Sequence, residues 1–287
     1  MPRTRLLVLV ALLAVAITVA LRPWSEPHRD LRRFMDDHDL RGVSLVYGAV
    51  GSEPETVGIG QPADMVRPYY SLSKPLTAFA VIEATKRDIV SLDDTVEGAT
   101  LRQLLNHSGG WDREEAGDPV FENTSDAPCT ALPAPPRQFA PGERYAYSNI
   151  GYCLAGQHLA DAVGVSYAEA VRGLLPETAD MQYDGRIGPA GGWSGTARQF
   201  WDVAARPIPP EMLEDPIPRP GDTPYGLGWG VEENGRLSHF GWLTTQDTYA
   251  ATVRKDDFVV VALFAGVPDK PRRALRELRI ILPELTD

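Results

Sequence analysis

The sequence predicts an α+β fold in which one sheet is assembled from both ends of the chain, with a helical insertion between them. Near the start, predicted strands over 43–48 and 55–59 flank a Gly-Ser-Glu-Pro segment that is typical of a hairpin turn. Near the end, apolar or alternating runs predict three more strands, over 237–242, 244–254 and 258–264. The middle of the chain shows helical spacing instead, so we expect it to add helices and not strands.

Helical periodicity places the remaining elements. Helices are predicted near both ends and in the middle, over 28–40, 71–89, 101–105, 150–163, 166–175 and 272–282. Two long irregular connections separate them, 112–143 and 206–224, and the second contains seven prolines. Loops of this length inside a compact domain are usually functional or mobile. No internal repeat or low-complexity tract is visible.

Composition and charge narrow the possible functions. The chain has 287 residues, of which 43% are hydrophobic and 23% charged, as expected for a globular protein with a sizeable core. Its 28 basic and 39 acidic residues give a formal net charge of −11. An acidic protein of this kind repels nucleic acid, so a nucleic-acid partner is excluded. Only four of the basic residues are lysines, which makes any lysine-containing motif informative.

The N-terminus predicts export. Arg3 and Arg5 precede a run of sixteen uncharged, mostly apolar residues over 6–21, which is the order of a signal peptide. Sixteen helical residues rise about 24 Å, slightly less than a bilayer span, and no A-x-A cleavage site follows. Residues 1–21 are therefore either a cleaved signal peptide or an N-terminal membrane anchor. In both cases the body is expected outside the cytoplasm, contacting a membrane only through this segment.

The two cysteines, Cys129 and Cys153, leave two alternatives open. In an oxidising compartment they can pair and close a loop of about two dozen residues, which adds about 3 kcal/mol of stability. The alternative is two separate buried thiols. No further cysteines or clustered histidines are present, so no metal site and no cofactor is predicted.

The first chemical motif is Ser71-Leu72-Ser73-Lys74, at the start of the predicted 71–89 helix. Residues three apart lie on one helix face, so the Ser71 hydroxyl and the Lys74 amine can meet. Serine is a weak nucleophile until a base removes its proton, and lysine becomes that base when burial and positive potential lower its pKa. The alternative is a serine cap followed by a solvated lysine.

Two further motifs supply complementary groups. Tyr147-Ser148-Asn149 offers a phenol, which exchanges its proton if cations hold its pKa down, and an amide suited to gripping a substrate amide. It is the most specific of the three motifs; its structural alternative is a capped turn. His239-Phe240-Gly241 lies on a predicted late strand, where glycine allows a substrate to approach and the Trp242 N–H can bind an oxyanion. Its alternative is a strand histidine beside a bulge.

These motifs resemble the serine β-lactamase and penicillin-recognising hydrolase family, in the class C-like branch that includes D-alanyl-D-alanine carboxypeptidases, D-aminopeptidases and esterases. The resemblance covers about residues 28–282 and extends to other stretches of the chain: 104–110, 139–143, 190–198 and 225–229. It implies an α/β/α sandwich, in which helices flank an antiparallel sheet. It also implies one serine hydrolase domain over 26–287, with the helical subdomain inserted at about 95–205.

The resemblance implies a role for each motif residue. Ser71 is the expected nucleophile, Lys74 its base, and Tyr147 the proton relay. Asn149, His239 and Gly241 are expected to bind substrate, with His239 at the position of the third motif's cation. The oxyanion hole is expected to consist of the N–H groups of Ser71 and Trp242.

The departures from the family pattern affect the expected substrate. Histidine replaces the lysine that lactamases have at 239, and Phe240 has no hydroxyl to bind a carboxylate. Both changes weaken β-lactams and peptide C-termini as ligands. We still rank a monomeric D-alanyl-D-alanine carboxypeptidase first, acting on a small-molecule or peptidoglycan-type peptide or ester. An esterase or D-aminopeptidase comes second and a β-lactamase third; a catalytically silent penicillin-binding sensor is the non-enzymatic alternative.

Overall fold

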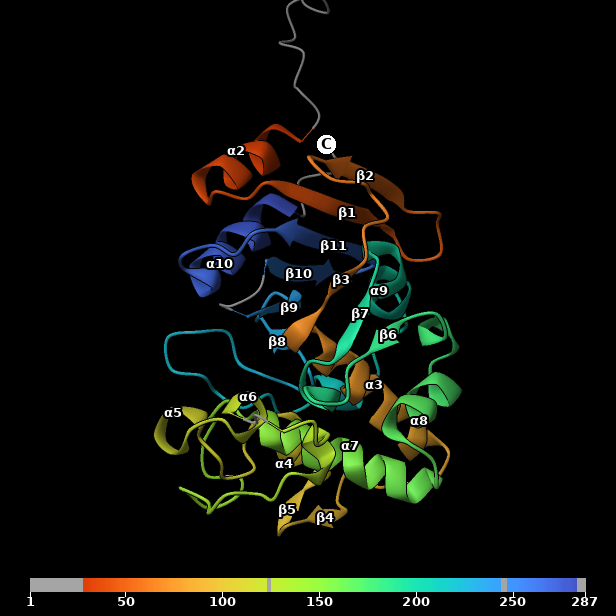
Figure 1. The fold of residues 1–287 in the computed structure, drawn as a ribbon, viewed down its shortest axis with the longest axis vertical. Helices are drawn as coiled ribbons and strands as arrows, with labels where there is room; N and C mark the ends of the chain where they lie inside the picture. Colours follow the sequence, from red (N-terminus) through yellow and green to blue (C-terminus); the bar gives the residue numbers. More distant parts are fainter. Residues whose placement is uncertain (1–27, 123–124, 244–246, 283–287) are drawn as a thin grey trace, which may run out of the picture.

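The computed structural model describes residues 28–122, 125–243 and 247–282. Its main element is a six-stranded antiparallel sheet in the order β2-β1-β11-β10-β9-β8 (Figure 1). The strands are β1 (Gly42–Ala49), β2 (Glu55–Ile59), β8 (Gly230–Val231), β9 (Leu237–Trp242), β10 (Thr248–Lys255) and β11 (Phe258–Ala265). Strands from both chain ends share this sheet, as the sequence predicts: β1 pairs with β11. The short strand β8 was not among the three late strands that the sequence predicted.

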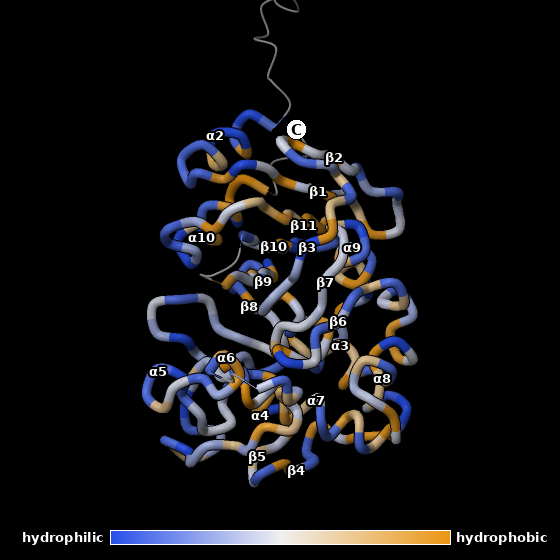
Figure 2. Tube along the Cα trace, in the orientation of Figure 1, coloured by the Kyte–Doolittle hydropathy of each residue, from blue (hydrophilic) through white to orange (hydrophobic). Residues whose placement is uncertain are grey.

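Alternation along the central strands gives the sheet two buried faces. On β11, Val260 packs in one hydrophobic cluster with α2 (Arg29–Asp37) and α10 (Pro271–Ile281), whereas the next residue, Val261, belongs to the cluster of the helical region. Successive side chains of a strand point to opposite faces, so a continuous apolar run serves both layers. Figure 2 shows this hydrophobic centre along β10 and β11, with hydrophilic residues on the outer loops.

The second face of the sheet carries α9 (Ala197–Ala204), which contacts β1 and β11. Beyond it lies the helical region, built around α3 (Ser73–Lys86), α4 (Leu101–Leu105), α5 (Arg113–Ala116), α6 (Pro119–Glu122), α7 (Asn149–Val163) and α8 (Tyr167–Leu174). Helix α3 is buried on nearly all sides, which explains its apolar sequence. The arrangement is a helix–sheet–helix sandwich with a helical subdomain, as the resemblance implies (Figure 1). Although α9 falls within the 95–205 segment, it packs on the sheet.

Short elements join these parts. Strands β3 (Arg67–Pro68), β7 (Trp193–Gly195) and β6 (Gln182–Tyr183) form a small sheet, and β4 (Thr95–Val96) pairs with β5 (Ala99–Thr100). The 3₁₀ turns are η1 (Tyr70–Leu72), η2 (Cys129–Ala131), η3 (Pro176–Thr178), η4 (Gly188–Ala190) and η5 (Pro210–Met212). The sequence did not indicate these two- and three-residue strands, because such short segments carry no measurable periodicity.

Two predicted boundaries shift. The helix predicted over 71–89 is the 3₁₀ turn η1 followed by α3, which ends at Lys86, because Asp88 adopts a left-handed φ of 55° that a helix cannot continue. The strand predicted over 244–254 is β10 and begins at Thr248; residues 244–246 lie outside the described part of the chain.

A disulfide joins Cys129 of η2 to Cys153 of α7, so the structure supports the pairing alternative. The bond fastens the irregular 112–143 connection to the central helices. The predicted leader, residues 1–21, lies outside the described residues. Within residues 28–122, 125–243 and 247–282, none of the helices combines the length and apolar character needed to cross a membrane.

Candidate active site

Ser71 lies in the turn η1, between the edge of the main sheet and α3. The preceding residue, Tyr70, has a left-handed φ of 47°, an uncommon conformation for a non-glycine residue that costs conformational energy. Packing against β9 and α3 holds this turn in place. Ser71 thereby lines a cavity of about 420 Å³ between the sheet and the helical region. Strain next to a cavity-lining serine is consistent with a functional site.

Lys74 is the residue positioned to act as the base for Ser71. Its side chain is fully buried, and its Nζ lies 3.3 Å from Ser71 Oγ. The same Nζ donates hydrogen bonds of 2.7 Å to Asn149 Oδ1 and of 2.7 Å to the Ala190 carbonyl. Burial and the Arg113 guanidinium lower the pKa of Lys74 well below its ordinary value. A neutral amine has two hydrogens and one lone pair, so two donated bonds leave the lone pair for the Ser71 proton.

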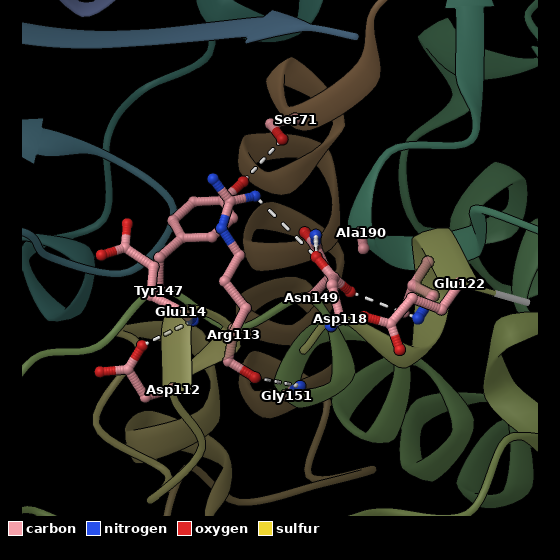
Figure 3. Close-up of polar contacts among 12 residues, drawn as sticks. Ser71, Asp112, Arg113, Glu114, Asp118, Glu122, Tyr147, Asn149, Gly151 and Ala190 are labelled. Carbon is pink, nitrogen blue, oxygen red and sulfur yellow. Dashed lines mark hydrogen bonds and ion pairs between the residues drawn. The ribbon is translucent and has the colours of Figure 1, made fainter. Parts of the chain in front are cut away.

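Tyr147 completes the arrangement from the opposite side. It lies just before α7, whose N-cap is Ser148, and its hydroxyl donates a 2.6 Å hydrogen bond to Ser71 Oγ (Figure 3). An amine, a guanidinium and an imidazole surround the ring: Lys74 Nζ lies 4.7 Å from its centroid, Arg113 Cζ 4.5 Å, and the His107 ring centroid 4.4 Å. Tyr147 therefore contacts the serine and a cation at once.

The pKa of Tyr147 is raised, whereas the sequence-based expectation was a phenol whose pKa is held below its ordinary value. Burial raises the pKa of Tyr147, and this effect exceeds the lowering by Arg113 and by the hydrogen bond to Ser71. The resting phenol is therefore protonated and acts as a donor. It can give its proton to a leaving group, and any negative charge left on its oxygen needs a nearby cation.

Asn149 lies where the sequence predicts but has a different set of contacts. Its Oδ1 accepts from Lys74, its Nδ2 donates a 2.6 Å bond to Asp118 Oδ2, and only 1% of the residue is exposed. It is not among the residues lining the 420 Å³ cavity. In this arrangement Asn149 positions the amine of Lys74, because both ends of its amide are engaged in the interior; its contact with a substrate amide stays a prediction.

His239 lies at the cavity, where the sequence predicts it, but its surroundings favour the neutral form. It lies on β9 and lines the cavity, and its Nε2 is 2.9 Å from the Tyr225 hydroxyl. Burial, Lys74 and Arg219 together lower the pKa of His239 well below its ordinary value. A neutral imidazole therefore occupies the position at which the resemblance implies a cation. Sequence alone could not show this, since the burial of a histidine depends on the whole fold.

Gly241 brings β9 against the nucleophile. A Cβ at this position would lie 2.8 Å from the Ser71 nitrogen and 2.7 Å from the Leu72 nitrogen, and it would overlap the Tyr69 carbonyl. Only glycine permits this approach. Ser71 and Trp242 both line the cavity, so the predicted oxyanion donors lie on its wall.

Three residues that contact the site were not predicted from the sequence as site residues: Arg113, Asp118 and His107. Arg113 and Asp118 lie in the irregular 112–143 connection and line the cavity beside Tyr147. His107 accepts a 3.1 Å bond from the Ser148 N–H, and its ring packs against the Tyr147 ring. The one available signal was the length of the connection, which is typical of functional loops.

Comparison with known families agrees with this geometry. A family model described as "Beta-lactamase" matches residues 28–182, more than half of the chain. The chain belongs to the beta-lactamase family. It is accordingly a serine hydrolase of that family, and the predicted resemblance and enzyme class are confirmed.

Within the described residues, no cluster of three or more His, Cys, Asp or Glu side chains is arranged to hold a metal ion.

The curated relatives of this beta-lactamase-family protein match only part of its sequence, at modest identity. Penicillin-binding protein 4* of Bacillus subtilis (strain 168) is 29% identical over 143 residues, which cover 42% of this chain and 31% of that relative. The matched segments span only 30% to 39% of the length of the curated relatives that the chain matches. These relatives therefore share part of their length with the chain.

Solved structures cover more of the chain at lower identity. The D-amino acid amidase from Ochrobactrum anthropi SV3 aligns with a TM-score of 0.72 at 17% identity, covering 89% of this chain and 98% of that one. A beta-lactamase/D-alanine carboxypeptidase from Yersinia pestis gives 0.71 at 15% identity, covering 89% and 96%. These likenesses confirm the predicted fold class.

Proposed function

We propose that this protein is an exported hydrolase that cleaves amides or esters through an acyl-enzyme on Ser71, with D-alanyl-D-alanine peptides as its preferred substrates. One observation carries the proposal: Ser71 Oγ contacts both the buried amine of Lys74 and the hydroxyl of Tyr147. A structural serine needs neither contact, and a lysine buried without a carboxylate partner is costly unless its amine is neutral.

In the proposed acylation, Lys74 Nζ takes the Ser71 hydroxyl proton while Oγ bonds to the substrate carbonyl carbon. The resulting oxyanion accepts hydrogen bonds from the Ser71 and Trp242 N–H groups. The bond to the leaving group then breaks as Tyr147 gives that group its proton, and the proton held by Lys74 restores the phenol. All three side chains return to their starting protonation states, and the acyl group stays on Ser71.

In deacylation the same groups act in the opposite sense. A water attacks the acyl carbon and loses one proton towards Tyr147 and Lys74. The ester bond to Ser71 breaks, and Oγ regains a proton from the same pair. No separate carboxylate base is required by this scheme.

The cavity supports a substrate that carries a carboxylate. Four arginines and three carboxylates line it, although the chain as a whole has a net charge of −11: Arg113, Arg219, Arg272, Arg279, Glu114, Asp118 and Glu122. Arg219 is our candidate anion binder: its guanidinium lies 4.8 Å from the centroid of the Tyr145 ring at the cavity wall, and its Nη2 donates a 2.7 Å bond to Asp222. In this proposal the part of the guanidinium that faces the cavity supplies the positive charge that neutral His239 and apolar Phe240 do not.

Export is part of the proposal and rests on the basic and apolar order of residues 1–21. The Cys129–Cys153 disulfide supports it, because such bonds persist in oxidising compartments.

An esterase or D-aminopeptidase is the second candidate. Phe240 favours it, because a phenyl group at the middle of the third motif offers no hydroxyl to a substrate carboxylate. Substrates without a terminal carboxylate would then be preferred.

Ser71→Ala is expected to abolish covalent labelling by both a fluorescent penicillin and a fluorophosphonate, because the acylated oxygen is removed. Labelling is read on a gel, with turnover measured on a D-Ala-D-Ala peptide, nitrocefin and p-nitrophenyl esters. Ser52→Ala, an exposed serine in the β1–β2 turn, is the control and should label like wild type. Labelling that persists in Ser71→Ala, or a wild-type protein that no acylating probe labels, would contradict the proposal; the latter result favours a silent sensor.

Arg219→Gln is expected to remove the preference for a substrate carboxylate. Losing a charge-assisted hydrogen bond lowers affinity by about 10- to 100-fold. The measurement is kcat/KM for an acyl-D-Ala-D-Ala peptide against the same peptide with a C-terminal amide. We expect the ratio to fall towards one in the variant. Because both rates come from one preparation, partial unfolding cancels; an unchanged high ratio would show that another group binds the carboxylate.

A further inference from the structure

The site holds an unassigned cation beside its proton donor. In this fold the resting phenol of Tyr147 is protonated, and the histidine of the third motif is buried and hydrogen-bonded to Tyr225. When Tyr147 gives up its proton during bond cleavage, its oxygen becomes negatively charged in a partly buried position at the cavity wall. An unpaired charge in such surroundings is strongly unfavourable. Protonated Lys74, 4.7 Å from the ring centroid, supplies one positive charge at that moment, and a permanent charge close to the ring lowers the cost further.

Arg113 provides that charge. It is the first residue of α5, and its backbone N–H donates to the Tyr147 carbonyl at 3.4 Å. Its guanidinium carbon lies 4.5 Å from the Tyr147 ring centroid, within the range of cation–π interactions. Its side chain is 32% exposed and lines the cavity. Backbone and side chain thus hold Arg113 to the same tyrosine.

Asp118 holds the guanidinium from the other side. Its Oδ2 lies 3.9 Å from an Arg113 terminal nitrogen and accepts the 2.6 Å bond from Asn149, which in turn binds Lys74. Its Oδ1 accepts a 3.3 Å bond from the Val120 N–H, which fixes the carboxylate. Figure 3 shows these side chains as a chain of contacts that links Lys74's partner Asn149 to Arg113 and Tyr147.

We propose that Arg113 stabilises the negative charge on Tyr147 while its proton passes to the leaving group, and that it replaces the third-motif cation in this role. The inference rests on the proposed acyl-enzyme mechanism. In the step, the bond between the carbonyl carbon and the leaving group breaks, and the leaving atom takes the electron pair and the Tyr147 proton. The phenolate then regains the proton that Lys74 took from Ser71. Arg113 keeps its charge throughout, since a guanidinium does not deprotonate.

Substrates whose leaving groups differ in basicity can distinguish this role of Arg113 from a purely structural one. A p-nitrophenolate departs without a proton, whereas an ethoxide or an amine needs one. The rates are compared at a pH above the acid limb of both proteins, because Arg113 also lowers the pKa of Lys74. There, Arg113→Gln is expected to lower kcat/KM for an ethyl ester by about 10- to 100-fold, with less than about a threefold loss for the p-nitrophenyl ester of the same acyl group. Arg113→Lys should recover part of the ethyl-ester rate, because it keeps the charge.

The control is Arg198→Gln, which removes an arginine on α9 that lies over the Trp201 ring outside the cavity. It should leave the ratio of the two rates unchanged. An equal loss for both esters in Arg113→Gln, or no loss in either, would overturn the inference. Weaker ethyl-ester binding with an unchanged single-turnover rate of acylation at saturating ester would assign Arg113 to substrate binding and would overturn it as well.

Failure of the proposed function gives a different result. If Ser71→Ala still turns over both esters, the acyl-enzyme mechanism is lost whatever the Arg113 variants do. If Ser71→Ala is inactive and Arg113→Gln keeps the wild-type ratio, only the present inference fails.

Discussion

Replacing Lys74 with methionine is expected to lower the acylation rate of Ser71 by about 10⁴-fold, because the base that takes the serine proton is lost. General bases contribute about 10²- to 10⁴-fold, and removing a member of a coupled nucleophile–base pair has effects at the upper end or above. Methionine retains the length and apolar stem of the buried side chain. The measurement is the rate of covalent labelling by a fluorophosphonate, followed by rapid sampling.

The pH dependence of acylation tests the same assignment. Protonated Lys74 has no lone pair, so the rate should fall about tenfold per pH unit below its pKa and level off above it. Burial, with Arg113 adding to it and Asp118 opposing it, holds that pKa well below the ordinary value for lysine. The plateau is therefore expected at a lower pH than a solvated lysine would allow. Removing the positive charge of Arg113 should move the acid limb to higher pH.

The control for Lys74→Met lies on the same helix. Lys86, in the last turn of α3, is half exposed and paired with Glu83. Lys86→Met removes an identical group at the surface and should leave the acylation rate and its pH profile unchanged. A Lys74→Met protein that is folded by circular dichroism and acylates within tenfold of wild type would remove Lys74 from the role of base.

The sequence predicted the features of this protein that are local in the chain. The hairpin over β1 and β2, the serine–lysine spacing, and the tyrosine before a helix each depend on residues a few positions apart. The three late strands and the closing helix were also visible, because their apolar patterns are long enough to establish a period. The meeting of Ser71 with Tyr147, 76 positions along the chain, followed only from the family resemblance.

What the sequence did not reveal depends on burial and on contacts across loops. The neutral state of His239 comes from a fold that encloses it with Lys74 and Arg219 nearby. The engagement of Asn149 by Asp118 comes from an irregular segment with no period to read. Arg113 is one of 24 arginines, so composition could not distinguish it. The roles of Asp118 and Arg113 became visible only once the 112–143 connection was placed against Asn149 and Tyr147.

Gly241→Ala is expected to lower acylation by about 10²- to 10³-fold, the loss typical of removing one oxyanion donor. The new Cβ would press on the Ser71 and Leu72 nitrogens and on the Tyr69 carbonyl, all of them backbone atoms that cannot rotate away. Strand β9 and the turn η1 must therefore separate. This moves the N–H groups of Ser71 and Trp242 relative to each other, while Lys74 and Tyr147 stay anchored in the helical region.

The same substitution distinguishes the contribution of the oxyanion hole to the rate from that of the base. Overpacking of this kind costs about 1–3 kcal/mol of stability, so thermal unfolding is measured alongside labelling. Gly173→Ala on α8 is the matched control, since a Cβ there meets no heavy atom within 4 Å and should leave labelling unchanged. Because Gly241→Ala leaves the base in place, the acid limb of its pH profile should coincide with that of wild type while the plateau falls. A folded Gly241→Ala protein with a wild-type plateau would mean that the approach of β9 to Ser71 serves packing alone.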